Sequence, residues 1–99
     1  MPIRPTGDRT VEDGDVLFGM MDDRRHALCR VTGEALRERG RRDGVRGAAI
    51  ELFERYELDV YEAANRKYES GEAGPDGRIV VASVDLAAVA GVEESVSRR

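Results

Sequence analysis

The sequence predicts an α+β fold: a two-layer sandwich in which a three-stranded, mainly antiparallel sheet carries helices on one face, in the order β-β-α-α-β. Two short apolar runs at residues 16–21 and 25–31 alternate with a period of two. A long stretch at residues 45–70 has the apolar spacing of a helix, and a β-branched run follows at residues 78–83. The length of 99 residues suits one domain with one core.

The first two runs are expected to form a β-hairpin around Asp22-Asp23-Arg24. This segment lacks the Asn-Gly or Asp-Gly pair that favours tight hairpin turns, so the turn type stays open. Side chains that are two residues apart share one face of a strand. The face expected to meet the helices carries Phe18, Met20, Ala27, Cys29 and Val31.

Two helical segments are expected next. Thr32 is a good N-cap for a short helix that Gly40 ends, and Asp43 is a candidate N-cap for the long one. A continuous helix over residues 45–70 would be about 39 Å long, so a break near residues 56–59 stays open. Gly71 is expected to end this segment. The apolar stripe at spacings of three and four consists of Ala49, Phe53, Tyr56, Val60, Ala63 and Lys67.

Residues 74–77, Gly-Pro-Asp-Gly, form a strong turn signal before the last strand. Ser83 or Asp85 is then expected to cap a short helix that reaches residue 90. The domain is expected to span residues 15–90. Residues 1–14 are expected to be a flexible N-terminal tail with at most a short edge strand near Thr10-Val11, and residues 91–99 a frayed C-terminal tail.

Composition narrows the function classes. Sixteen basic residues against twenty acidic ones give a net charge of −4, which disfavours general nucleic-acid binding. A single cysteine cannot form an internal disulfide. The first fifteen residues lack a signal-peptide core, and no apolar run approaches the ~20 residues of a membrane span. We expect a cytoplasmic protein without membrane contact, and its arginine-rich usage is typical of a GC-rich prokaryotic genome.

The order of several short motifs points to a family. A hairpin ending in Cys29-Arg30-Val31-Thr32 is followed by a helix with Phe53-Glu54-Arg55-Tyr56. Lys67-Tyr68, a glycine-rich turn and a strand leading to Asp85-Leu86 follow. Over about residues 14–86 the chain resembles the small bacterial proteins of domain-of-unknown-function family fourteen-eighty-eight (DUF1488). The resemblance implies a small α+β fold with no established reaction, so it supplies no catalytic residues.

His26 and Cys29 form an H-x-x-C spacing that superficially resembles a metal site. A structural zinc site needs four ligands, and positions 26 and 29 of a strand point to opposite faces. We therefore expect no metal: an edge-exposed histidine and a buried thiol explain both residues. Lys67 is expected to pack its stem on the core and reach water with its amine. Because no catalytic or phosphate-loop motif is visible, we expect no catalytic residues, no cofactor and no enzyme activity.

Five arginines lie within ten positions at the junction of the two predicted helices, interrupted by Glu38 and Asp43. Those nearest the second helix start, Arg41, Arg42 and Arg46, are candidate anion contacts. A solvated connector is the favoured alternative, because no aromatic residue lies among them to stack on bases.

The second face of the predicted sheet is also apolar, with Leu17, Met21, Leu28 and Val80 as candidate interface residues. Exposed apolar patches of this kind usually mark an interface, so we expect a second copy of the chain or the N-terminal tail to cover it. The sequence thus favours a non-enzymatic binding or self-associating module, with a homodimer or an unknown protein partner. The alternative is a nucleic-acid or phosphate-binding accessory protein that uses the basic stretch at residues 37–46.

Overall fold

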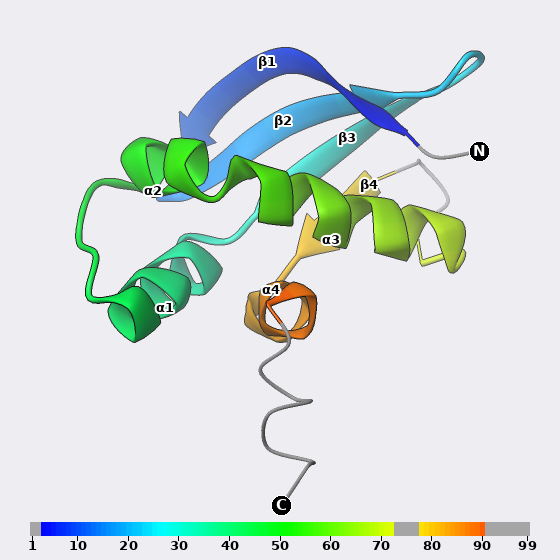
Figure 1. Ribbon diagram of the computed structural model, residues 1–99. Helices are drawn as coiled ribbons and strands as arrows, with labels where there is room; N and C mark the ends of the chain where they lie inside the picture. Colours follow the sequence, from blue (N-terminus) through cyan, green and yellow to red (C-terminus); the bar gives the residue numbers. More distant parts are fainter. Residues whose placement is uncertain (1–2, 73–77, 91–99) are drawn as a thin grey trace, which may run out of the picture.

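The computed structural model describes residues 3–72 and 78–90. In this part of the chain a four-stranded sheet lies on one side and four helices on the other, which confirms the two-layer α+β fold (Figure 1). The sheet has one strand more than the sequence predicts. The strands are β1 (Arg4–Glu12), β2 (Asp15–Met21), β3 (His26–Val31) and β4 (Arg78–Val81). The helices are α1 (Gly33–Asp43), α2 (Ala49–Arg55), α3 (Glu57–Glu69) and α4 (Ser83–Val89).

The predicted hairpin is present as the antiparallel pair β2–β3, in which Val16 lies opposite Val31. Its turn is closed by Asp22, whose Oδ1 accepts the backbone N–H groups of Arg24 and Arg25 at 2.8 and 2.7 Å. The Asp22 N–H in turn donates to the Arg25 carbonyl at 2.9 Å. A side-chain oxygen that satisfies the turn in this way explains why no glycine is needed there.

Strand β4 runs parallel to β3, with Ile79 opposite Cys29 and Val81 opposite Val31. The strand is shorter than expected because α4 begins at Ser83. The N-cap is Ala82 and not Ser83 or Asp85 as predicted, because the helix already begins at Ser83; Asp85 lies in its first turn, where Oδ2 accepts the Ala82 N–H at 2.8 Å. The turn signal at residues 74–77 and the expected frayed end at residues 91–99 lie outside the described residues.

The expected flexible tail at residues 1–14 is wrong, because Arg4–Glu12 forms the edge strand β1, paired antiparallel with β2. The register shifts between Pro5 and Arg9, where Gly7 has a φ of 95°. Ile3, just before the strand, is only 6% exposed, and its N–H donates to Asn65 Oδ1 at 3.1 Å. Proline, glycine and a bulge are common on edge strands, where half of the backbone groups face away from the sheet.

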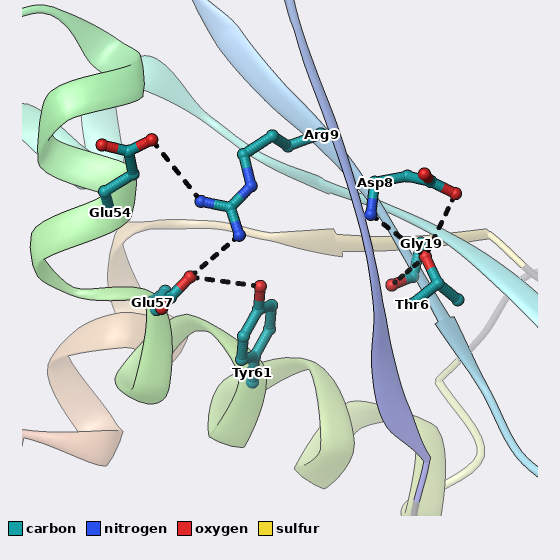
Figure 2. A network of polar contacts seen from close by, with 7 residues as sticks. All are labelled: Thr6, Asp8, Arg9, Gly19, Glu54, Glu57 and Tyr61. Atoms are coloured by element: carbon teal, nitrogen blue, oxygen red, sulfur yellow. Dashed lines mark hydrogen bonds and ion pairs between the residues drawn. The ribbon is translucent and has the colours of Figure 1, made fainter.

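Arg9 holds this edge strand to the helices (Figure 2). Its guanidinium lies 3.1 Å from a Glu57 carboxylate oxygen and 3.7 Å from one of Glu54. It also lies 5.0 Å from the centre of the Phe53 ring. The Tyr61 hydroxyl donates to the same Glu57 oxygen at 3.4 Å. One side chain of β1 therefore contacts both α2 and α3.

Helix α1 begins as predicted, with Thr32 Oγ1 accepting the Ala35 N–H at 3.0 Å. It does not end at Gly40, because the helix continues to Asp43 and ends at Gly44, where φ is 72°. Gly40 lies inside the helix instead, where Val45 N–H donates to its carbonyl at 2.7 Å. A Cβ at Gly40 would lie 2.5 Å from the Val45 carbonyl oxygen, so only glycine permits this contact.

The stretch expected to be helical at residues 45–70 is divided. Residues 45–48 are not helical. Tyr56, with a φ of −109°, separates the end of α2 from the start of α3. The break thus falls within the range that the sequence leaves open. Asp43 does not cap the second helix, since it is the last residue of α1. Glu51 caps α2 instead, by accepting the Ala48 N–H at 2.8 Å. Gly71 follows the end of α3 with a φ of 80°.

The core lies between the sheet and the helices. Its largest contact joins Phe18 of β2 to Phe53 of α2, with ring centres 5.3 Å apart. All side chains predicted for the inner face of the hairpin are buried: Phe18, Met20, Ala27, Cys29 and Val31. In the described ranges no helix combines the length and apolarity needed to cross a membrane.

Candidate binding surfaces

The outward face of the sheet, which we call the open face, carries an apolar centre. Strand register sets Arg30 between Leu17 and Val80, and Leu28 beside Arg78. Leu28 and Val80 are each 47% exposed. They lie on the solvent side of the sheet, whose other side forms one wall of the core. A groove of about 380 Å³ runs over this centre, lined by Leu17, Leu28 and Val80 together with polar side chains that include Glu12 and Arg30.

The structure therefore brings together Leu17, Leu28 and Val80 of the predicted interface residues. Met21 lies at the hairpin end of the open face, opposite Arg4, and does not line the groove. The N-terminal segment is not what covers this face, because β1 lies beside β2 within the sheet. That part of the prediction is wrong, since an edge strand widens a face instead of covering it.

Charged groups mark one end of the open face. The two guanidinium nitrogens Nη1 and Nη2 of Arg30 lie 2.7 Å from Asp15 and 2.6 Å from Glu12. Asp15 also accepts the Gly33 N–H at 2.7 Å. This backbone hydrogen bond and the Arg30 guanidinium hold the pKa of the Asp15 carboxyl below its ordinary value. Asp15 thus joins the open face to the start of α1 and fixes the position of Arg30.

The opposite end of the open face carries Arg4 and His26, which flank Met21 in the strand register. Arg4 also lies 3.8 Å from Asp23 of the hairpin turn, and both side chains are mostly exposed. The open face therefore carries the Glu12 and Asp15 carboxylates with Arg30 at one end, Arg4 and His26 at the hairpin end, and apolar side chains between them.

A second surface lies on the helix side of the molecule. Arg41 and Arg46 of the predicted anion contacts line one pocket of about 240 Å³, and Arg37 joins them there. Arg42 is turned away and lines a smaller pocket against α4. We call the first the arginine pocket; its lining residues are Arg37, Arg41, Val45, Arg46, Gly47 and Leu52.

The remaining arginine of the basic stretch, Arg39, is occupied within the fold. Its guanidinium lies 2.7 Å from an Asp59 oxygen and 3.6 Å from one of Asp43. It also stacks 4.7 Å from the centre of the Tyr56 ring, whose hydroxyl donates to Asp43 at 2.9 Å. The short spacing between Arg37, Arg39 and Arg41 therefore conceals two different roles on two sides of α1.

His26 and Cys29 point to opposite faces of β3, as strand alternation predicts: His26 is exposed and Cys29 is fully buried. Burial raises the pKa of the Cys29 thiol to about 12, so the nucleophilic thiolate is scarce near neutral pH. Within residues 3–72 and 78–90, no group of three or more His, Cys, Asp or Glu side chains is placed to hold a metal ion.

The paired motif residues Lys67 and Tyr68 tie separate elements together. The Lys67 ammonium contacts Asp85 of α4, instead of reaching only water as the sequence predicts. The Tyr68 hydroxyl donates to Asp22 Oδ2 in the hairpin turn at 2.7 Å. Both partners lie far away in the sequence, so no local pattern identifies them.

Comparison with known proteins agrees with this architecture. Residues 8–81, about three quarters of the chain, match the family described as "Protein of unknown function (DUF1488)". The crystal structure of a protein of unknown function from the same family, from Shewanella loihica PV-4, is similar with a TM-score of 0.67. It shares 20% sequence identity, and the match covers 81% of this chain and 91% of that one. No curated protein matches the chain at a significant level. The hairpin, α1, α2, α3 and β4 all fall within the matched segment, and the chain belongs to the DUF1488 family.

Proposed function

We propose that this chain is a non-enzymatic binding module that associates with a second copy of itself through the open face. The observation that carries the proposal is the exposure of Leu28 on the inner strand β3 and of Val80 on the neighbouring edge strand β4. Two large aliphatic side chains that are nearly half exposed beside a groove are unfavourable in water. Covering them with a partner lowers the free energy of the protein.

The distribution of charge favours a second copy as the occupant. Two open faces can stack about a two-fold axis that lies between the sheets, either along the strands or across them. An axis along the strands would place Glu12 and Asp15 of one copy over the same residues of the other. An axis across the strands places these carboxylates over the hairpin end, with the Arg4 guanidinium and the His26 imidazole. The second arrangement is self-complementary and brings the apolar centres into contact.

The polar groups of the groove are better suited to binding a partner protein than to catalysing a reaction. Arg30 already contacts two carboxylates, so its charge is balanced and its position fixed. Such a fixed pair at the rim of an apolar patch contributes orientation and specificity to an interface.

The mass of the protein in solution tests the proposal. Small interfaces of this kind give about micromolar affinities, so light scattering over a dilution series should show a reversible monomer–dimer equilibrium. Leu28→Glu should yield a folded monomer, because two carboxylates would then face each other across the interface. Leu58→Glu is the matched control: Leu58 is 78% exposed on α3, on the helix side of the molecule, and its replacement should leave the dimer intact.

A wild-type protein that stays monomeric at about 0.1 mM would contradict the proposal, since that concentration exceeds the expected dissociation constant about a hundredfold. Equal loss of dimer in Leu28→Glu and Leu58→Glu would contradict it as well, because the open face would then have no special part in association.

A further inference from the structure

We infer that the arginine pocket binds the phosphate group of a small phosphate monoester. This site lies on the helix side, away from the open face, and is independent of self-association. Three arginines, Arg37, Arg41 and Arg46, line a single pocket of about 240 Å³, and the Arg37 guanidinium is turned toward Gly33 and the Asp15 carboxylate. Arg37 and Arg41 are one helical turn apart on α1, and Arg46 approaches from the segment that follows the helix.

Two of the pocket arginines, Arg41 and Arg46, have no carboxylate partner in the described part of the chain. In the described part of the chain Arg4, Arg9, Arg30, Arg39 and Arg66 each lie within 4 Å of a carboxylate oxygen. Over the same residues Arg37, Arg41 and Arg46 form no such ion pair. Arg37 still lies close enough to Asp15 to help lower the pKa of that carboxyl, so Arg41 and Arg46 are the pocket cations without a carboxylate partner in the described residues.

The Glu51 carboxylate lies beside Gly47 of the pocket lining but forms no ion pair with Arg41 or Arg46 among the described residues. Glu51, the acidic residue closest to Arg46 in the following helix, is held by the Ala48 N–H at 2.8 Å. Glu34 and Glu38 lie on α1 but form no ion pair with the pocket arginines within the described residues. The charges of Arg41 and Arg46 are therefore left for an anion from solution to neutralise.

The backbone fixes the shape of the pocket before any ligand arrives. Val45 N–H donates to the Gly40 carbonyl at 2.7 Å, and Gly44 adopts a φ of 72° to turn the chain back onto α1. The missing Cβ of Gly40 lets Val45 lie against the helix, next to Leu52. Arg46 is thereby anchored one residue from a fixed point, which reduces the entropy lost on binding.

The chemistry of the pocket selects the ligand. A phosphate monoester carries a charge of about −1.5 to −2 at neutral pH and three acceptor oxygens, which suit several guanidinium donors. Val45 and Leu52 supply an apolar contact for the group that carries the phosphate. No aromatic side chain lines the pocket to stack on a base, and the net charge of −4 disfavours a long polyanion. These features favour a small molecule over a nucleic acid.

Nuclear magnetic resonance titration of the full chain tests this inference, with inorganic phosphate and phenyl phosphate as probes. We expect saturable shifts confined to the signals of residues 37–52, with phenyl phosphate binding more tightly because its ring contacts Val45 and Leu52. The variant Arg41→Gln/Arg46→Gln should weaken both probes at least about tenfold. The control Arg24→Gln/Arg42→Gln removes the same charge away from the pocket and should leave binding within about twofold of the wild type.

Three outcomes would overturn the inference. The first is the absence of saturable shifts with either probe. The second is an equal loss in the two double variants, which would show that binding follows only overall charge. The third is a short single-stranded DNA that binds at the same residues more tightly than phenyl phosphate. All four replaced arginines are exposed, so both variants should keep the melting temperature of the wild type.

Discussion

The ammonium nitrogen of Lys67 lies 3.0 Å from a carboxylate oxygen of Asp85, across the boundary between α3 and α4. Each side chain is only 20% exposed. The same Asp85 oxygen accepts the Ala82 N–H at the start of α4. One carboxylate therefore both begins the last helix and fastens it to the longest one, and both residues belong to the motifs that carry the family resemblance.

Asp85→Ala should lower the free energy of unfolding by about 2 kcal/mol, because it removes a helix cap and leaves a half-buried ammonium without its partner. Asp85→Asn keeps an oxygen for the Ala82 N–H and should cost less. Urea denaturation of both variants measures the difference. Equal stability of Asp85→Ala and the wild type would show that the contact contributes nothing.

The hairpin turn should respond to acid through Asp22. The N–H of Arg24, the Tyr68 hydroxyl and the N–H of Arg25 lower the pKa of the Asp22 carboxyl from 3.8 to about 2. Because this pKa is depressed in the folded state, its stabilisation is complete above pH 3.8 and is lost as the pH falls toward 2. In Tyr68→Phe the Asp22 pKa should rise but stay below 3.8, since the backbone donors remain.

Titration of the side-chain carboxyl signals by nuclear magnetic resonance measures this change directly. Tyr61→Phe is the control, because its hydroxyl contacts Glu57 and not Asp22. An Asp22 pKa that is the same in Tyr68→Phe and in the wild type would contradict the assigned cause.

Arg9→Ala should loosen strand β1. The side chain is 28% exposed and contacts two carboxylates and the Phe53 ring, so its loss should cost about 1–2 kcal/mol and speed amide exchange along the strand. Arg4→Ala removes a second arginine of β1 whose ion pair is mostly exposed, and should change stability by less than about 0.5 kcal/mol. The prediction fails if the two variants show the same exchange rates in β1.

Gly40→Ala should destabilise the protein by about 3 kcal/mol, although alanine normally stabilises a helix. The new methyl group would lie 2.5 Å from the Val45 carbonyl oxygen, which is backbone and cannot rotate away. Gly44→Ala meets open space and only the strain of a positive φ, so about 1 kcal/mol is expected. Thermal denaturation ranks the two, and a more stable Gly40→Ala would refute the proposed close contact.

The Cys29 thiol should react with a disulfide reagent only when the chain opens. It is fully buried, and burial raises its pKa to about 12, so both access and the thiolate are lacking in the folded state. Labelling rates in increasing urea should rise with the unfolded fraction. Rapid labelling in the absence of denaturant would show that the inner face of β3 is accessible.

Alternation and capping made much of the fold predictable. Strand alternation puts Phe18 and Cys29 on one face and Leu17 and Leu28 on the other, so the period of two groups the side chains of the inner face correctly. Thr32 begins α1 as expected because the N-cap is a local hydrogen bond to Ala35. These features depend on contacts between residues close in sequence, which a sequence pattern can carry.

Strand β1 was not predictable in the same way. Pro5 and Gly7 resemble a tail, and the strand is stabilised by distant residues: Arg9 by Glu57, and Ile3 by the core. The end of α1 was also missed, because Gly40 acts by close contact with Val45 and not by ending the helix. In both cases the deciding interaction joins segments whose approach no local spacing encodes.

The binding surfaces were predictable in part. Strand alternation places Leu17, Leu28 and Val80 on one face, but the position of Met21 outside the groove depends on where the groove runs. Arg41 and Arg46 meet in one pocket, while Arg42, next to Arg41 in sequence, points to α4 because adjacent residues on a helix face different directions. Arg37 precedes Arg41 by one helical turn, and this spacing is the sequence signal that identifies Arg37 as the third arginine of the pocket lining.

The order β1-β2-β3-β4 has a consequence for synthesis of the chain. The first three strands leave the ribosome as a continuous meander and can pair at once, whereas β4 follows only after α1, α2 and α3. Until those helices emerge, the nascent sheet presents Phe18 and Cys29 to water on one side and Leu28 on the other. A newly made chain is therefore most vulnerable to aggregation in this interval, when a chaperone that binds apolar sheet surfaces would protect it.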